Sequence, residues 1–114
     1  MEDTARIDIV KTVADTITEH SGIDTQLIDV RGMSSWTDYF IISTVSSSAH
    51  LRGLIKYIRK ALSGEDVNII NRQKKYEEGG WVLLDCGYFV IHLMDEEARN
   101  FYGLEKLWHE GVSG

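Results

Sequence analysis

The chain has 114 residues, of which 43% are hydrophobic and 26% are charged, and its formal net charge at pH 7 is −6. This length and composition predict a single domain over residues 1–114 that buries enough surface to fold without disulfides or metal. The acidic charge disfavours a general affinity for nucleic-acid phosphates, and no apolar run is long enough to suggest a membrane-spanning helix.

Two features bear on the cellular location. The first ten residues, MEDTARIDIV, lack the basic start and the apolar middle of a secretory signal. Cys86 is the only cysteine, so no internal disulfide can form. We therefore expect a reducing, cytoplasmic location.

Apolar residues in the first part of the chain recur at the spacing of one helix face. This spacing predicts a helix from Thr4 to His20, with the face formed by Val10, Val13, Ala14 and Ile17. The β-branched residues that follow predict a short strand from Thr25 to Val30. A second strand is predicted from Tyr39 to Val45, where the sequence reads YFIISTV.

The next element is predicted to be a second helix, which ends near Ser63. The preceding run Ser46–Ser48 supplies hydroxyl groups that can cap its first turn. One stripe of this helix is apolar and consists of Leu51, Leu54, Ile55, Ile58 and Leu62. Four basic residues lie elsewhere on its surface, namely Arg52, Lys56, Arg59 and Lys60.

A third strand is predicted at Val67–Ile70, and residues 81–94, WVLLDCGYFVIHLM, predict a β-hairpin. Apolar residues occupy both faces of this hairpin, whereas a strand with one face in water alternates apolar with polar. Either helices cover both faces, or one face is exposed for a partner. Trp81 and Met94 are residue types that partner surfaces use as anchors.

Asp95 is predicted to cap a last helix, since Glu96 and Glu97 then lie in the first turn, where the helix dipole favours negative charge. Gly103 interrupts this helix, and a final turn over residues 104–109 is expected to pack Trp108 on the core. In this order the elements predict an α/β (α+β) fold, with a mixed sheet of about five strands flanked by helices.

A search for catalytic or metal-binding groups ends in structural explanations. The histidines, which are His20, His50, His92 and His109, are not spaced as metal ligands. His92 fits a partly buried, hydrogen-bonded position better than a ligand or a base. Ser46–Ser48 lacks the glycines and lysine of a phosphate loop, and no Asp-x-Asp pair follows it to hold magnesium, so helix capping is favoured.

The remaining candidates for a catalytic site are Cys86 and the carboxylates of residues 95–97, and neither fits that role. No base is identifiable for Cys86 as a nucleophile, and the adjacent carboxylates of residues 95–97 do not converge on one point. We therefore predict no enzyme activity, no metal and no cofactor. An interaction surface on the hairpin is what remains.

Three segments together resemble the ribosomal silencing factor family, also called the Iojap-like family. They are Asp29–Thr44 (DVRGMSSWTDYFIIST) with the serines that follow, Gly80–Gly87 (GWVLLDCG), and Val90–Met94 (VIHLM) running into Phe101–Trp108 (FYGLEKLW). The match extends from about Ile9 to Trp108. The turn commonly reads Asp-Tyr-Gly-Asp in the family, whereas here it is Asp85-Cys86-Gly87-Tyr88.

The resemblance implies a fold similar to nucleotidyl transferases, without their catalytic carboxylates. It implies a translational repressor that binds the large ribosomal subunit through its ribosomal protein fourteen. Such a protein sterically blocks association with the small subunit and lowers translation under nutrient limitation. The implied partner-binding residues are Trp81, Leu83, Asp85, Cys86 and Met94.

Two other interpretations stay open at this stage. In an RNA-binding or large-subunit assembly factor, the contacts to peripheral ribosomal RNA would come from Arg72, Lys74, Lys75, Lys56, Arg59 and Lys60. A degenerate nucleotidyltransferase-like protein would instead use the turn formed by Ser46–Ser48, which we call the serine turn. A homodimer is compatible with an exposed hairpin edge, and no membrane partner is expected.

Overall fold

The computed structural model describes residues 2–35, 37–75 and 80–103, with the side chains of residues 2–5 and 71–75 left out of the description. In chain order the elements are α1 (Glu2–Glu19), β1 (Ile23–Asp29), β2 (Tyr39–Thr44), α2 (Ser48–Leu62), β3 (Asn71–Lys75), β4 (Trp81–Asp85), β5 (Phe89–Met94) and α4 (Glu96–Tyr102). The final turn predicted around Trp108 lies outside the described residues.

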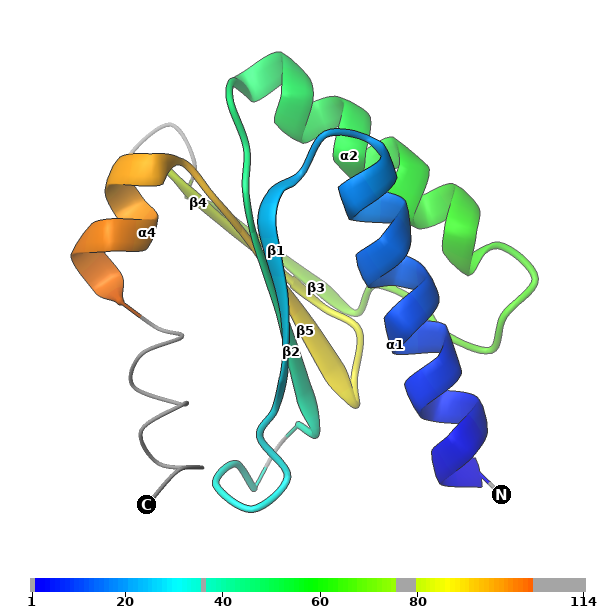
Figure 1. Ribbon diagram of the computed structural model, residues 1–114. Helices are drawn as coiled ribbons and strands as arrows, with labels where there is room; N and C mark the ends of the chain where they lie inside the picture. The colour runs from blue at the N-terminus through cyan, green and yellow to red at the C-terminus, as the bar shows by residue number, and fades with distance from the viewer. Residues whose placement is uncertain (1, 36, 76–79, 104–114) are drawn as a thin grey trace.

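The strands form one sheet in the order β1-β2-β5-β4-β3 (Figure 1). The central pair, β2 and β5, is parallel, and the other three pairs are antiparallel. The prediction of a mixed sheet of about five strands with flanking helices is therefore confirmed.

Helices α1 and α2 lie side by side over one face of the sheet, and α4 lies over the opposite face (Figure 1). The predicted apolar stripe of α2 is buried in full, and Val10, Val13 and Ile17 of α1 are buried beside it. From the sheet, Val82, Leu84, Phe89 and Ile91 join this core cluster. Burial of these side chains supplies most of the stability of the domain.

The second face carries a smaller apolar cluster, so the hairpin is apolar on both faces, as predicted. Its buried members are Ile28, Val30, Phe40, Ile42, Val90, Met94 and Ala98, with Trp81 and Leu83 packed against them. Ala98 belongs to α4, so this helix covers the end of the face where Met94 lies.

The helix caps follow the predicted pattern. The Ser47 hydroxyl accepts a hydrogen bond from the His50 N–H at 3.0 Å at the start of α2. Asp95 Oδ1 accepts from the Ala98 N–H at 2.7 Å at the start of α4. Gly103 ends α4 in the left-handed conformation, with φ of 55°.

The prediction of a third strand at Val67–Ile70 is wrong. The strand is Asn71–Lys75, which pairs with β4 so that Asn71 lies opposite Asp85. Its sequence, NRQKK, has no apolar alternation, because β3 is the last strand in the sheet order and is held by backbone pairing with β4. Val67 is buried, but it packs in the α1/α2 core as part of the connecting segment.

Candidate functional site

The candidate site lies on β4 and α4, on the sheet face opposite α1 and α2. Along β4, Val82 and Leu84 are buried, whereas Trp81, Leu83 and Asp85 are only partly buried. Trp81 and Leu83 pack on the second-face cluster. Two of the five predicted partner-binding residues therefore lie together on this face, with Asp85 at the end of the same strand.

Trp81 belongs to a group of aromatic side chains that the sequence analysis did not predict, with Tyr102 at its centre. The Trp81 ring centroid lies 4.9 Å from that of Tyr102, and the Tyr102 centroid lies 5.0 Å from that of Phe101. Phe101 is 80% exposed and Tyr102 is 46% exposed. We call Trp81, Phe101 and Tyr102 the aromatic cluster.

The aromatic cluster results from the strand register. Trp81 pairs with Met94, the last residue of β5, and α4 begins two residues later at Glu96. A short helix that starts there places its own aromatic pair near the first residue of β4. The adjacent aromatics at 101 and 102, so soon after the hairpin, were the signal that could have revealed this.

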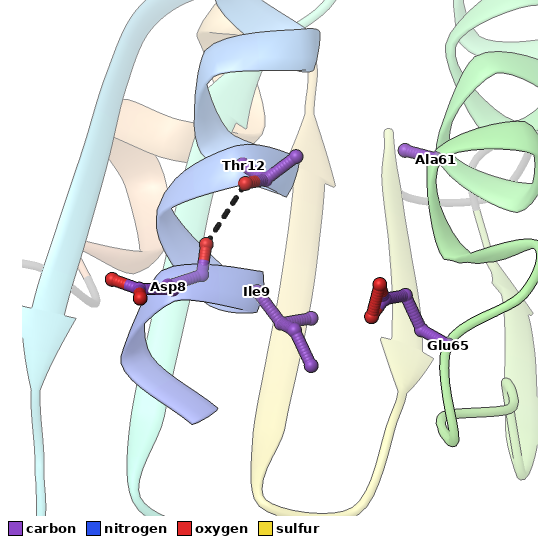
Figure 2. A pocket seen from close by; sticks show the side chains of 5 residues that line it. All are labelled: Asp8, Ile9, Thr12, Ala61 and Glu65. Atoms are coloured by element: carbon purple, nitrogen blue, oxygen red, sulfur yellow. Dashed lines mark hydrogen bonds between the residues drawn. The ribbon is translucent and has the colours of Figure 1, made fainter. Parts of the chain in front are cut away.

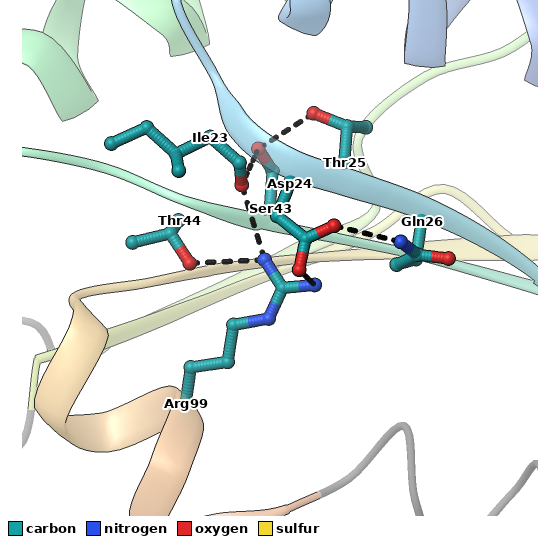
Figure 3. Close-up of polar contacts among 7 residues, drawn as sticks. All are labelled: Ile23, Asp24, Thr25, Gln26, Ser43, Thr44 and Arg99. Carbon is teal, nitrogen blue, oxygen red and sulfur yellow. Dashed lines mark hydrogen bonds and ion pairs between the residues drawn. The ribbon is translucent and has the colours of Figure 1, made fainter.

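A buried arginine fixes α4 in this position (Figure 3). The Arg99 guanidinium donates to Thr44 Oγ1 at 2.9 Å and to the Ile23 carbonyl at 3.1 Å, and it forms a 3.5 Å ion pair with Asp24. Ile23 and Thr44 are paired across β1 and β2. Arg99 thus ties α4 to the ends of two strands, and Phe101 and Tyr102 lie two and three residues further along the same helix.

Two of the predicted contact residues lie in the interior, which corrects the predicted surface. The Met94 side chain is 0% exposed, because it belongs to the buried second-face cluster together with Ala98 of α4. Cys86 is 4% exposed and packs in the α1/α2 core. Burial, with a further contribution from the Asp85 charge, raises the pKa of the Cys86 thiol to about 12. Neither side chain is available as a surface contact.

The turn after β4 uses the Asp85 carboxylate internally. Asp85 Oδ1 accepts from the Gly87 N–H at 2.9 Å, and Gly87 has φ of 92°. Tyr88, at which the chain departs from the family pattern, packs on the α1/α2 core, with the Arg6 guanidinium 4.9 Å from its ring centroid. Both departures, Cys86 and Tyr88, therefore face the helices α1 and α2 and lie away from the aromatic cluster.

His92 is the polar residue at the base of the aromatic cluster. It is 3% exposed, and its Nδ1 accepts a hydrogen bond from Trp81 Nε1 at 3.1 Å, so the ring proton is on Nε2. Nε2 is buried and has no hydrogen-bond partner among the residues that the structure describes. Burial lowers the pKa of His92 to about 4, which keeps the ring neutral near pH 7. The interpretation of His92 as a buried, hydrogen-bonded histidine is confirmed.

The serine turn is occupied by contacts within the protein. Ser47 caps α2, and the Ser46 N–H donates to His50 Nδ1 at 3.0 Å. His50 Nε2 in turn contacts the His20 carbonyl at 2.9 Å. These contacts agree with capping. Within the described part of the chain, no three His, Cys, Asp or Glu side chains are grouped closely enough to hold a metal ion.

A cleft of about 320 Å³ lies between α1 and the segment that ends α2 (Figure 2). It is lined by Asp8, Ile9, Thr12, Ala61 and Glu65. The Thr12 hydroxyl donates to the Asp8 carbonyl at 2.9 Å within α1. None of these five described lining residues is a nucleophile hydrogen-bonded to a side-chain base. Among the described helices, none is long and apolar enough to cross a membrane.

These features define a small α+β domain with an exposed aromatic surface on the less covered face of its sheet. The family model described as "Ribosomal silencing factor during starvation" matches residues 3–113. The chain belongs to the ribosomal silencing factor family, as the resemblance of its motifs predicted.

Similar proteins come from bacteria and from a mammal. A ribosomal silencing factor of Haemophilus influenzae is 31% identical over 100 residues, which are 88% of this chain and 97% of that protein. A mouse protein named "Mitochondrial assembly of ribosomal large subunit protein 1" is 33% identical over 107 residues, covering 91% of this chain and 46% of its own. A crystal structure from Chromobacterium violaceum superposes with a TM-score of 0.80 at 27% identity, covering 90% and 84% of the two chains.

Proposed function

We propose that this protein binds the large ribosomal subunit through its ribosomal protein fourteen and thereby blocks association with the small subunit, lowering translation under nutrient limitation. The mechanism is occlusion, in which no bond is made or broken. A 13.0 kDa domain at a subunit contact acts by steric clash, and its effect follows from occupancy.

The aromatic cluster is the observation that supports this proposal most directly. Aromatic residues are enriched at the centres of protein interfaces, where a few anchors contribute most of the binding energy. Phe101 and Tyr102 are exposed although they are large and apolar, and the Tyr102 ring packs against both Trp81 and Phe101. The partner-binding set that we propose is therefore Trp81, Leu83 and Asp85 from the original prediction, together with Phe101 and Tyr102.

Charge supports the choice of a protein partner at this surface. The net charge of −6 opposes general association with ribosomal RNA, whereas it favours encounter with a basic ribosomal protein. A contact of this kind depends mainly on apolar burial, so we expect it to survive moderate salt.

The test is co-sedimentation with purified large subunits, followed by addition of small subunits. The informative variant is Phe101→Ala, because a side chain that is 80% exposed contributes little to folding. Its matched control is Met33→Ala, which removes a 39% exposed apolar side chain from the connection between β1 and β2. That connection leads into Tyr39, opposite Phe89, so it lies at the far end of the sheet from α4.

We expect the wild type and Met33→Ala to bind large subunits and prevent joining, and we expect Phe101→Ala to bind at least tenfold more weakly, a change of about 1.4 kcal/mol or more. Equal binding by the two variants would remove the aromatic cluster from the interface. Failure of the folded wild type to bind any large subunit would overturn the proposal as a whole.

A role in assembly of the large subunit is the second candidate, favoured by the name of the mouse relative. The two roles predict different preferred targets. A silencing factor binds mature large subunits and prevents joining, whereas an assembly factor binds precursor particles more tightly than mature ones. The same sedimentation assay with precursor particles separates them.

A further inference from the structure

Helix α2 is positively charged, although the protein as a whole is negatively charged. It carries Arg52, Lys56, Arg59 and Lys60, all of them exposed. No acidic residue occurs between Asp38 and Glu65, although the chain contains 18 Asp and Glu residues. A positive segment of this length in a protein with a net charge of −6 requires an explanation.

The four basic residues lie on one stripe of the helix. At about 100° per residue, positions 52, 56, 59 and 60 fall within a sector about 100° wide. The buried side chains of α2, among them Leu54 and Ile58, lie on the other side of the helix. The stripe extends about 12 Å along the helix axis, at about 1.5 Å per residue between Arg52 and Lys60. We call these four residues the basic stripe.

No side chain of the basic stripe forms an ion pair with another described residue. The ion pairs within the described part of the chain are Arg31 with Asp29 and Arg99 with Asp24. The neighbouring helix α1 exposes Asp15 and Glu19, but neither forms a salt bridge with α2. The positive charges therefore face solvent.

The stripe is not explained by helix stability alone. Arg59 and Lys60 lie in the last turn of α2, where the helix dipole favours cations. The dipole gives no such benefit to Arg52, near the start of the helix, and the first turn of α2 contains no acidic residue. Solubility is already served by the net negative charge.

We propose that the basic stripe of α2 is a contact surface for an RNA phosphate backbone, and, resting on the proposed function, that this RNA belongs to the large ribosomal subunit. Four exposed cations without an apolar anchor among them suit a line of phosphates. Protein interfaces usually depend on such an anchor at their centre. The nearest large apolar side chain, Tyr57, is 42% exposed, but at about 100° per residue it lies outside the sector of the basic stripe, and it stacks on His20 with ring centroids 3.5 Å apart.

The two faces of the sheet then have different partners. The aromatic cluster beside α4 contacts protein, and the basic stripe on α2 contacts RNA from the opposite side of the domain (Figure 1). The acidic exposed residues of α1, beside α2, limit the RNA contact to one strip and so help to set the orientation of the domain on the particle.

The test measures binding to a short RNA duplex of about 20 base pairs as salt is raised from about 50 mM to about 200 mM. The single variants Lys56→Gln and Lys11→Gln are matched, because each removes one exposed positive charge, from α2 and α1 respectively. The triple variant Lys56→Gln/Arg59→Gln/Lys60→Gln removes most of the stripe. Circular dichroism confirms that each variant is folded.

We expect the wild type to bind the duplex, Lys56→Gln to reduce the salt slope by about 1, and Lys11→Gln to leave the slope unchanged. The triple variant should lose duplex binding and bind large subunits several-fold more weakly at low salt. Absence of duplex binding by the wild type, or an equal effect of Lys11→Gln, would overturn the RNA contact. Weakened subunit binding by the triple variant without any duplex binding would instead assign the stripe to an acidic protein segment.

The same assays distinguish failure of the RNA contact from failure of the proposed function. If the wild type fails to bind large subunits but the duplex results are as expected, the proposed function is overturned and the phosphate contact is supported.

Discussion

The indole Nε1 of Trp81 donates a hydrogen bond to Nδ1 of His92 at 3.1 Å, and this contact joins the candidate interface to the interior of the sheet. The two residues lie on adjacent antiparallel strands, β4 and β5. The contact orients the indole against Tyr102 and holds His92 in one tautomer. Trp81 is therefore part of the fold as well as a proposed anchor for a partner. We expect Trp81→Ala to lower stability as well as binding, which makes Phe101→Ala the cleaner test of binding.

The buried His92 predicts that stability falls in mild acid. Burial lowers the pKa of His92 from 6.5 to about 4, so the unfolded chain binds a proton more readily than the folded protein between these values. The contribution of the neutral His92 to the unfolding free energy is therefore present in full above about pH 6.5 and is lost as the pH falls toward 4. From about pH 7.5 to about pH 5 we expect His92 to cost about 2 kcal/mol of unfolding free energy.

Urea denaturation of the wild type and of His92→Gln at both pH values checks this prediction. The other histidines are present in both proteins, so the difference between the two pH slopes isolates His92. Identical slopes would show that His92 does not titrate as its burial indicates.

The sequence pattern predicted the helices, four of the five strands and the two-faced hairpin, because local periodicity and burial agree in these elements. Strand β4 is an example: Val82 and Leu84 are buried in the α1/α2 core, and the alternating residues Trp81 and Leu83 pack on the second-face cluster. β3 was misplaced, since an edge strand held by backbone pairing needs no apolar alternation. The interface was only partly predictable, because whether Met94 is exposed depends on where α4 packs, and that is a long-range contact.

Arg99 is predicted to be required for the position of α4. Replacing it with Met removes a buried guanidinium that is 7% exposed, and it deprives Thr44 Oγ1 and the Ile23 carbonyl of a charged donor. We expect Arg99→Met to lower the unfolding free energy by about 3 kcal/mol, measured by urea denaturation.

Asp24→Asn is the matched control, because it removes the other partner of the same ion pair. The Asp24 side chain is 67% exposed and its carboxylate is 3.5 Å from the guanidinium, so we expect a loss below about 1 kcal/mol. Equal losses for the two variants would mean that the ion pair, and not the buried hydrogen bonds, holds α4.

Two glycines in contrasting positions predict opposite effects of the same substitution. A Cβ at Gly53, within α2, would meet no atom within 4 Å, so Gly53→Ala should stabilise the protein by about 1 kcal/mol through helix propensity. A Cβ at Gly22 would lie 2.7 Å from Ser43 Oγ and 2.8 Å from the Ile17 carbonyl. Gly22→Ala should therefore cost about 2 kcal/mol through overpacking. Thermal unfolding of both variants shows whether each substitution raises or lowers the stability. A stabilising Gly22→Ala would contradict the close packing of α1 on β2.

Cys86 is predicted to be unreactive while the protein is folded. Its burial hides the sulfur, and a pKa raised from 9.0 to about 12 lowers the thiolate fraction near pH 8 by about a thousandfold. Because the chain has one cysteine, the absorbance change with Ellman's reagent reports this thiol alone. We expect the native protein to react at least a hundredfold more slowly than the urea-unfolded chain. A native rate within tenfold of the unfolded rate would place the thiol at the surface, and Cys86 would return to the set of partner-binding residues.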